Sequence, residues 1–285
     1  MKKKLLFSVW LNSLITIAEV IGGLMSGSLA LLGDSLHNFS DTMSLLASFI
    51  AIKIGERSKN EKYTFGYRRS EIIVAFLNSI SVVIISILIV VESVRRLLHP
   101  TVVHATVLLY VSLVGLAANL FSVFLLHEHS RESMNIRSAY LHLIADTLSS
   151  ILVVAGAVLM KAWEMYWLDP VIAAGITVYM LKEAYELLRE SLEVLMEASP
   201  NLSFESIKRE IEEIEGVKNA HHFHAWRVGE KEIHFECHVE VVENMELKDA
   251  QRIIDEIEAR LREHGVTHVT VQLECDRCQG RMICS

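Results

Sequence analysis

Six apolar runs, each about 20 residues or longer, occupy the first 200 residues of this 285-residue chain. An α-helix needs roughly 20 residues to cross the apolar core of a bilayer, so each run predicts one membrane span. The first run follows "MKKK" without a small-residue cleavage site, which favours a span over a signal peptide. The sequence thus predicts an α-helical membrane protein with six transmembrane helices. The predicted spans are 5–25, 29–54, 72–97, 105–126, 139–162 and 167–188.

The distribution of basic residues predicts how these spans are oriented. The N-terminus and the two loops on its side of the membrane hold eleven Lys and Arg residues, whereas the opposite loops hold three. By the positive-inside rule, both termini are expected to be cytoplasmic. The short chain and its "MKKK" start favour a bacterial inner membrane.

The segment after residue 198 differs from the rest in charge. From Pro200 onward the chain has 18 acidic and 11 basic residues, a net charge of −7, whereas residues 1–199 have 17 and 16, a net charge of −1. An acidic domain disfavours nucleic acid and anionic lipid as partners and favours cations. In a reducing compartment, cysteines are thiols or metal ligands more often than disulfides. All four cysteines lie in this tail: Cys237, Cys275, Cys278 and Cys284.

The tail has the periodicity of a small α/β domain. "FESIKREIEEI" and "LKDAQRIIDEIEARLREH" are helical in pattern, while "AHHFHAWRV", "EIHFECHVEVV" and "THVTVQLE" are extended or alternating. The order helix, strand, strand, helix, strand predicts a ferredoxin-like unit that lacks one strand. The chain is therefore expected to divide into a membrane domain, 1–198, and a cytoplasmic domain, 199–285. A domain of about 85 residues would gain stability from a partner subunit or a bound metal.

Ionisable residues interrupt two of the apolar runs at the same spacing. In "GDSLHNFSD" His37 lies four residues before Asp41, and in "AYLHLIAD" His142 lies four residues before Asp146. Residues four apart share one face of an α-helix, so each pair projects together. A single such pair could arise by chance or serve helix packing. Two pairs at similar depth predict an ion path, because a charge at the bilayer centre costs roughly 2.5–3.5 kcal/mol.

Two imidazoles and two carboxylates form a ligand set suited to a tetrahedral divalent ion, above all Zn²⁺. The second and fifth spans run in opposite directions, so the two pairs can close around one ion from opposite ends. Asp34 lies one turn before His37 on the same helix face. It either orients His37 without binding the metal itself or lines the outer opening of the ion path, and a supporting role is favoured.

Several stretches together resemble the cation diffusion facilitator family. They are "GDSLHNFSD", "AYLHLIAD", "YTFGYRRSEIIVAFLN", "HAWRVG" and "THVTVQLE", and the resemblance covers nearly the whole chain. It implies a homodimeric antiporter that exchanges cytoplasmic divalent cations for protons. The family's transport-site positions match His37, Asp41, His142 and Asp146. The resemblance further implies a preference for zinc, with cadmium often accepted, because manganese-type relatives have Asp or Asn at the two His positions.

This sequence departs from many zinc members of that family in one loop. It lacks their long His-rich segment between the fourth and fifth spans and retains only "HEH". His127 and His129 are therefore interpreted as loop residues and not as a metal-collecting site.

The tail has a second set of candidate metal ligands. Alternation places Cys237 on the apolar face of its strand and His238 on the polar face, and His221, His222 and His224 add imidazoles from the preceding strand. The family resemblance implies that His221, His238, His268 and Glu274 bind zinc there. Cys275 and Cys278 form a C-x-x-C motif, which is weaker as an indication of metal. A solvated sheet face with incidental histidines is the alternative interpretation.

Three functions are compatible with these features. The leading hypothesis is a Zn²⁺/H⁺ antiporter that works by alternating access. An intramembrane zinc metalloenzyme is disfavoured, because no H-E-x-x-H motif is present and four protein ligands leave no open position for water. A membrane-bound metal sensor is the third. The physiological metal among zinc, cadmium, iron, cobalt and manganese, and the number of cytoplasmic metal ions, stay open at this point.

Overall fold

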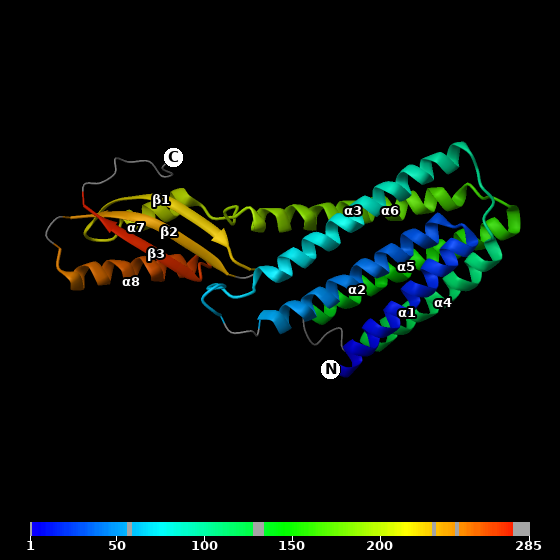
Figure 1. The fold of residues 1–285 in the computed structure, drawn as a ribbon, viewed down its shortest axis with the longest axis horizontal. Coiled ribbons are helices and arrows are strands. Elements are labelled where there is room, and N and C mark those ends of the chain that lie inside the picture. The colour runs from blue at the N-terminus through cyan, green and yellow to red at the C-terminus, as the bar shows by residue number, and fades with distance from the viewer. Residues whose placement is uncertain (1, 56–58, 128–133, 230–231, 243–244, 276–285) are drawn as a thin grey trace. The chain divides into compact units, whose positions relative to one another are not determined.

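A computed structural model of the chain describes residues 2–55, 59–127, 134–229, 232–242 and 245–275. The chain is mostly helical, with a small three-stranded sheet near its C-terminus (Figure 1). It divides into two compact units, which are described separately below. The membrane unit comprises Met1–Phe49 and Ala75–Leu188, and the tail unit comprises Ile50–Val74 and Arg189–Ser285.

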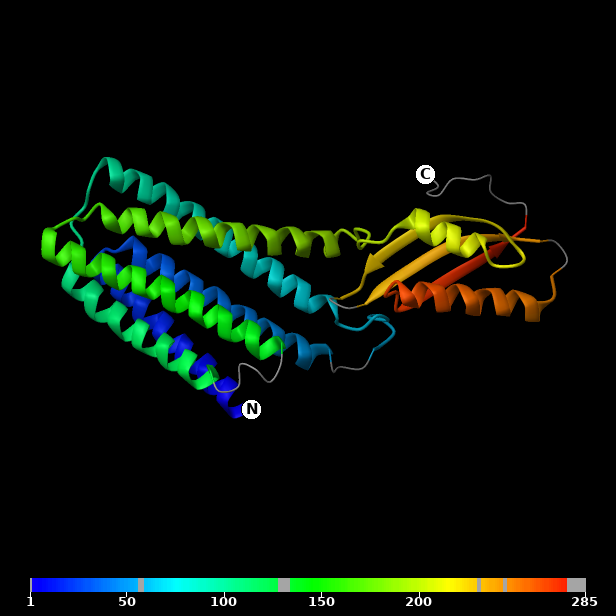
Figure 2. The same cartoon turned by 180° about the vertical axis from the view of Figure 1, so that it is seen from behind.

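Six long helices come first along the chain. In the membrane unit α1, α2, α4 and α5 run side by side, and α4 packs against both α1 and α5 (Figures 1 and 2). Hydroxyl side chains inside these helices donate to their own backbone, as Thr16 does to the carbonyl of Asn12 at 2.8 Å. Such bonds satisfy polar groups where water is absent. The helices are α1 (Lys2–Ser26), α2 (Leu29–Gly55), α3 (Arg69–Leu98), α4 (Ala105–His127), α5 (Met134–Trp163) and α6 (Leu168–Leu195).

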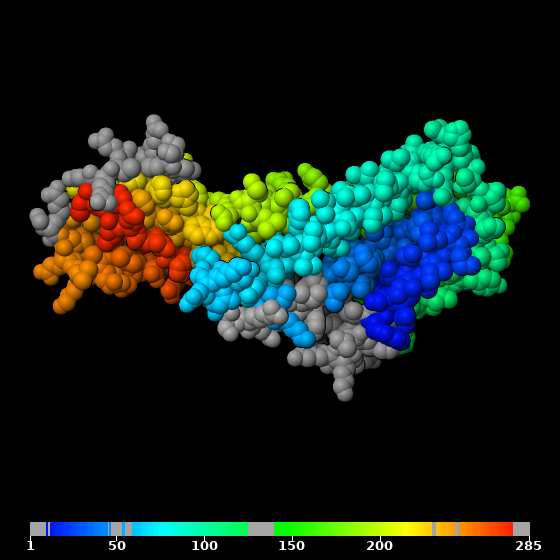
Figure 3. Space-filling view, viewed as in Figure 1, coloured from blue at the N-terminus to red at the C-terminus, as the bar shows by residue number. Residues whose placement is uncertain are grey.

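Apolar residues both fill the membrane unit and cover its outside. Leu31, Leu108 and Ala157 are buried between the helices. Leu88 of α3 and Val114 of α4 are each 62% exposed. The space-filling view shows α1 and α3 forming surface of this unit (Figure 3). An apolar exterior of this extent is what a lipid environment favours.

Three described helical segments are long and apolar enough to cross a membrane: Arg69–Leu98, Ala105–Phe124 and Tyr140–Trp163. α1 contributes a shorter apolar segment, Asn12–Ser26. The remaining two helices include ionisable side chains among their apolar residues, such as Asp34 and Asp41 in α2 and Lys182 and Glu183 in α6. Six long helices are therefore present. Segments of three of them are long and apolar enough to span a membrane, so the number of six spans stays a prediction.

The first turn of α2 is capped by a residue from another helix. Gly27 has a φ of +71°, a left-handed conformation that a glycine adopts readily at the sharp turn between α1 and α2. Asp169, at the start of α6, is fully buried and accepts hydrogen bonds from the Leu29 amide at 2.7 Å and the Ala30 amide at 3.2 Å. The Ser28 hydroxyl donates to the same carboxylate. The free amides of the α2 N-terminus are thus satisfied by a charge of the favourable sign.

Replacing Asp169 with alanine should destabilise the membrane unit markedly. The change leaves buried amides of α2 without acceptors, and hydrogen bonds to a charged group contribute about 1.5–3 kcal/mol each. We expect the melting temperature of the detergent-solubilised protein to fall by about 5 °C or more. Glu186→Ala, at an exposed position on the same helix, is the control. Equal melting temperatures for the two variants would mean that this cap contributes little.

The tail unit contains a three-stranded sheet with two helices packed against it. The strand order is β1-β2-β3, with β1 and β2 antiparallel and β2 and β3 parallel. The predicted order of helix, two strands, helix and strand is confirmed. The elements are α7 (Phe204–Glu212), β1 (Val217–Arg227), β2 (Ile233–Val241), α8 (Leu247–Glu263) and β3 (His268–Glu274).

The core of the tail unit follows the predicted alternation in β2. Phe235, Cys237 and Val239 are buried against apolar side chains of α7 and α8, such as Ile211 and Ile257. Burial raises the pKa of the Cys237 thiol to about 12. The thiol therefore stays protonated at neutral pH, and Cys237 is a core residue, as its position in the strand predicts.

Candidate metal centres

Four ionisable side chains meet between α2 and α5 in the membrane unit. His37 and Asp41 come from α2, and His142 and Asp146 come from α5. One potential ligand atom from each of the four lies within 4.8 Å of all the others. The two pairs identified from their spacing therefore form a single cluster, with the size and composition of a tetrahedral zinc site.

The four side chains are paired between the helices. His37 Nε2 lies 2.8 Å from Asp146 Oδ1, and His142 Nε2 lies 3.0 Å from Asp41 Oδ2. The pairs within each helix are wider, at 3.7 Å for His37 with Asp41 and 3.9 Å for His142 with Asp146. Because α2 and α5 run in opposite directions, each histidine faces the carboxylate of the other helix. One ion placed among these atoms would replace both contacts at once.

A cavity of about 220 Å³ opens beside this cluster. His37, His142 and Asp146 line one side of it, and residues of α6, including Tyr179 and Glu183, line the other. Asp146 itself is only 6% exposed. The cluster thus borders a cavity next to α6, which a pair serving only helix packing would not require.

Asp34 lies one turn before His37 and joins α2 to α5. Its Oδ1 accepts from the Ser149 hydroxyl at 2.8 Å, and its Oδ2 accepts from the Ser150 hydroxyl at 3.3 Å. Asn119 of α4 in turn donates to the Ser150 oxygen at 2.9 Å. This network positions α2 against α5 beside the cluster, which is consistent with a supporting role for Asp34.

A second group of potential ligands lies on the sheet of the tail unit. His221, His238 and Glu274 place ligand atoms within 4.8 Å of one another. Glu274 Oε1 lies 2.9 Å from His238 Nδ1, and Glu274 Oε2 lies 3.5 Å from His221 Nε2. Those last two atoms are buried without a hydrogen-bond partner among the described residues. Buried polar atoms are normally satisfied, so an ion bound between them would supply the missing interaction.

A bulge in β1 creates this arrangement. The register of β1 against β2 shifts between His221 and His224, and His222 has a φ of +54°, which is uncommon for a residue with a side chain. As a result His221 points inward and is fully buried. His222 stacks on His238 with ring centroids 4.3 Å apart, and its Nε2 lies 3.3 Å from Nε2 of His224. Simple alternation does not predict which of the three histidines is buried.

His268 lies at the other end of β3 from Glu274. They lie six positions apart in an extended strand, which corresponds to about 20 Å. The structure therefore does not bring His268 into the group with His221, His238 and Glu274. Its ring lies 4.6 Å from that of His234, whose pKa is lowered mainly by burial.

The remaining predicted residues are placed as follows. Cys275 follows Glu274 directly and is exposed, and it is not part of the group of potential ligands that the described residues form there. Cys278 and His129 lie outside the described residues, and the side chain of His127 does as well.

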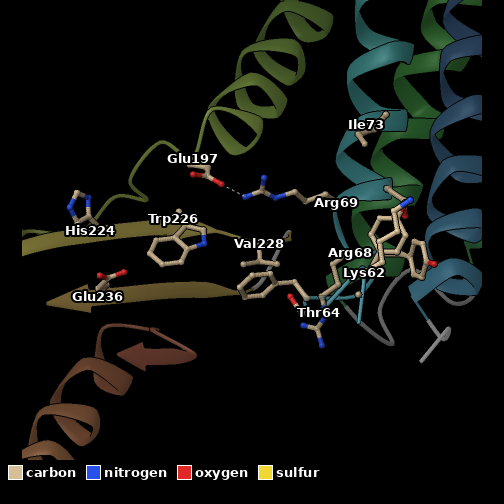
Figure 4. A pocket seen from close by; sticks show the side chains of 15 residues that line it. Lys62, Thr64, Arg68, Arg69, Ile73, Glu197, His224, Trp226, Val228 and Glu236 are labelled. Atoms are coloured by element: carbon tan, nitrogen blue, oxygen red, sulfur yellow. Dashed lines mark hydrogen bonds and ion pairs between the residues drawn. The ribbon is translucent and has the colours of Figure 1, made fainter. Parts of the chain in front are cut away.

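A larger pocket in the tail unit, of about 670 Å³, is lined by the segment before α3 and by β1 and β2 (Figure 4). Arg69 donates to Glu197 at 2.9 Å across it, and Arg68 pairs with Glu232. Phe65 packs edge-on against His234, with ring centroids 5.4 Å apart. These contacts attach the loop between α2 and α3 to the tail sheet. Because the loop and the sheet meet here through these contacts, we interpret this pocket as a packing contact within the tail unit and not as a ligand site.

Family models match both parts of the chain. A model described as the cation efflux transmembrane domain matches residues 5–196, and one described as the cytoplasmic domain of the cation efflux protein matches residues 199–276. The chain belongs to the cation diffusion facilitator, or cation efflux, family. Membership in this cation efflux family makes the protein an integral membrane protein, as its apolar helices also indicate.

Named members of the cation efflux family are similar over almost their full length. A cadmium, cobalt and zinc/H(+)-K(+) antiporter from Bacillus velezensis is 36% identical over 276 residues, which cover 96% of this chain and 88% of that protein. The zinc transporter ZitB of Escherichia coli is 34% identical over 284 residues, with 98% and 89% covered. The metal cation efflux system protein CzcD of Cupriavidus metallidurans is 32% identical over 280 residues, with 98% and 88% covered.

Proposed function

We propose that this protein is a secondary transporter that exports zinc from the cytoplasm in exchange for protons. The observation that carries the proposal is the cluster of His37, Asp41, His142 and Asp146 between apolar helices. Two ionised aspartates balance the charge of a divalent ion, and two imidazoles favour zinc over harder ions. Ionisable groups inside a membrane usually mark the path of an ion.

The names of the similar proteins support the same substrate class. The relatives from Bacillus velezensis and Escherichia coli are named as transporters of zinc, and the first also of cadmium and cobalt. The name of the first includes protons as an exchanged ion. We infer that this chain likewise moves divalent cations, with zinc as the main substrate, cadmium as an accepted one, and iron, cobalt or manganese as alternatives.

We further propose the arrangement of the chain in the membrane. Residues 1–198 form six transmembrane helices, both termini are cytoplasmic, and the membrane is the bacterial inner membrane. Residues 199–285 form a cytoplasmic domain through which two copies associate, as the matched domain of cation efflux proteins supports. The excess of basic residues in the loops on the N-terminal side supports this orientation.

Transport requires the ligands to change their exposure and protonation in turn. Deprotonated side chains bind Zn²⁺ from the cytoplasm, and movement of the helices then opens the site to the other side. Protons compete with the metal for His37 and His142, because imidazole titrates close to neutral pH, and the metal is released. The cavity beside α6 offers one route to the cluster.

The tail is proposed to bind zinc and to regulate transport. His221, His238 and Glu274 would hold the ion, and a high cytoplasmic zinc concentration would bring the two tails of a dimer together. The loop between α2 and α3 belongs to the same unit as the tail sheet, through Arg68, Arg69 and Phe65. Movement of the tails can therefore act on the ends of α2 and α3.

Measurement of metal flux into sealed vesicles that contain the purified protein tests the proposed function. Zinc should accumulate when a proton gradient is imposed, and protons should move in the opposite direction. Hydrolysis of a substrate without flux would favour a metalloenzyme, and zinc binding without either would favour a sensor.

The His37→Asp variant should weaken the preference for zinc. The change exchanges an imidazole for an oxygen ligand, which suits harder ions such as Mn²⁺. Competition between Zn²⁺ and Mn²⁺ in the vesicle assay measures the effect, with Glu186→Asp as the control for an exposed position. An unchanged ratio of the two ions would count against His37 as a ligand.

A further inference from the structure

A buried acid in α1 has no role in the site described so far. Glu19 is 1% exposed, although it lies in the middle of an apolar helix segment. Its Oε2 accepts a hydrogen bond from Nδ2 of Asn38 at 2.8 Å. Its Oε1 is buried and has no hydrogen-bond partner among the described residues. Such a group is costly in a membrane and is seldom kept without a function.

The neighbouring helix leaves space for the unpartnered oxygen. A Cβ added to Gly115 of α4 would lie 2.5 Å from Glu19 Oε1, so only glycine permits the present position of this carboxyl. The side chains described for α4 include no charged group that could neutralise it. The surroundings of Glu19 therefore leave room for its carboxyl group and provide it with one hydrogen-bond donor, Asn38.

Polar side chains lie between Glu19 and the metal cluster. Asn38, which binds Glu19, follows His37 in α2, and Asp34 lies one turn before Asn38 on the same face. Asp34 is held by the hydroxyls of Ser149 and Ser150 in α5. Two groups of hydrogen-bonded polar side chains, which join α1 to α2 and α2 to α5, thus lie one turn apart on α2.

Asp34 has two hydrogen-bond donors beside it and Glu19 has one. This difference favours the ionised form of Asp34 and the protonated form of Glu19. Asp34 accepts one hydrogen bond on each oxygen, as an ionised carboxylate requires. Among the described residues Glu19 accepts a single hydrogen bond, from Asn38, so its neutral acid is cheaper to bury than its carboxylate. The charged or titratable groups that face Glu19 are Asp34 and His37 of α2, and behind them His142 and Asp146 of α5.

We propose that Glu19 binds a proton that is exchanged for zinc, an inference that rests on the proposed antiport function. With the metal cluster empty, Glu19 holds its proton. When zinc binds, the positive charge favours the carboxylate, the O–H bond of Glu19 breaks, and the proton passes to water. When zinc leaves, a proton from water binds to Glu19 again. The ligand of this site is the proton itself, and Asn38 positions the carboxyl that carries it.

The test counts the protons released when zinc binds to the full-length protein. Titration calorimetry in two buffers of different ionisation enthalpy gives this number, and vesicle assays give the dependence of zinc flux on pH. Glu19→Gln keeps an acceptor for Asn38 but cannot ionise. It should still bind zinc, release about one proton fewer per ion, and show a weaker dependence of flux on the proton gradient, because His37 and His142 still exchange protons. Glu186→Gln, an exposed control, should match the unaltered protein in both measurements.

Two further measurements separate a proton-binding role from a packing role. Glu19→Asp keeps an ionisable group and should retain most of the proton release, whereas equal losses in the Asp and Gln variants would overturn the proposal. Infrared difference spectra of the unaltered protein need no variant to fold. Adding zinc should remove the signal of a protonated carboxyl group, and its persistence would also overturn the proposal.

The outcomes also separate this proposal from the proposed function. If the unaltered protein shows no zinc flux, the antiport function fails, whatever Glu19 does. If it transports zinc and Glu19→Gln releases the same number of protons with the same pH profile, the role of Glu19 is wrong and the transport function stands.

Discussion

Zinc flux into vesicles is expected to fall to background when either Asp41 or Asp146 is replaced by alanine. Each change removes one of four ligands and one of the two negative charges that balance Zn²⁺. In Asp146→Ala, His37 also loses the carboxylate 2.8 Å from its Nε2. Loss of a residue that only hydrogen-bonds to a metal ligand typically costs 10–100-fold in metal affinity, and loss of a ligand itself is expected to cost about 100-fold or more.

The two variants should nevertheless fold and assemble. Asp41 and Asp146 contribute to the cluster and not to the apolar contacts between the helices, so size-exclusion profiles should match those of the unaltered protein. Glu186→Ala provides the matched control for removal of an acid from the membrane unit. Normal flux in either aspartate variant, at normal protein levels in the vesicles, would be incompatible with the assigned transport site.

Zinc binding to the tail should raise its thermal stability and strengthen association between tails. A ligand at 100 times its dissociation constant stabilises the form that binds it by about 2.7 kcal/mol. For a domain of about 85 residues this corresponds to a shift on the order of 10 °C in melting temperature. The net charge of −7 also repels a second tail, and bound zinc reduces this repulsion.

Full-length Asp146→Ala protein allows the tail to be studied with the membrane cluster disabled. Calorimetry and sedimentation with and without zinc should show the shift and the tighter association. Adding Glu274→Gln should remove both, because this carboxylate contacts His221 and His238. An undiminished zinc effect in that double variant would contradict the assignment.

His268 supplies the matched comparison for Glu274. The family resemblance assigns His268 to the tail site, but it lies at the opposite end of β3. Adding His268→Ala to Asp146→Ala should therefore leave the zinc effect unchanged. Loss of the zinc effect would show that His268 is a ligand after all. It would then have to reach the ion from a second chain.

The membrane cluster could be predicted from the sequence because helix geometry determines it. Spacing of four places His37 with Asp41 and His142 with Asp146, whatever else the helices contact. The antiparallel order of the spans then orients the two pairs toward each other. Where the chain is regular and the pattern local, the spacing of residues was sufficient to identify which side chains lie together.

The tail site was less predictable because a strand's alternation defines a face but not a position along it. His268 and Glu274 share a face of β3 and still lie about 20 Å apart. The bulge that buries His221 depends on a positive φ at His222, for which the sequence offers no glycine as a signal. The burial of His221 could not be read from the pattern alone.

Asp169 and Glu19 were missed because their partners are distant in sequence. The amides that Asp169 caps lie 139 and 140 residues away, and Asn38 lies 19 residues from Glu19. The available signal was an acid at the start of an apolar run in one case and within such a run in the other. A buried acid in an apolar helix predicts a specific partner but does not identify it.

X-ray absorption spectroscopy at the zinc edge tests most directly whether the membrane cluster binds zinc as assigned. The sample is full-length protein with Glu274→Gln, which removes the tail site, loaded with one zinc ion per chain. Two imidazole nitrogens and two carboxylate oxygens at about 2.0–2.2 Å are expected, with no sulfur ligand. Adding Asp146→Ala should remove this signal. A zinc site with sulfur at about 2.3 Å, or one that persists unchanged in the Asp146→Ala protein, would contradict the assignment.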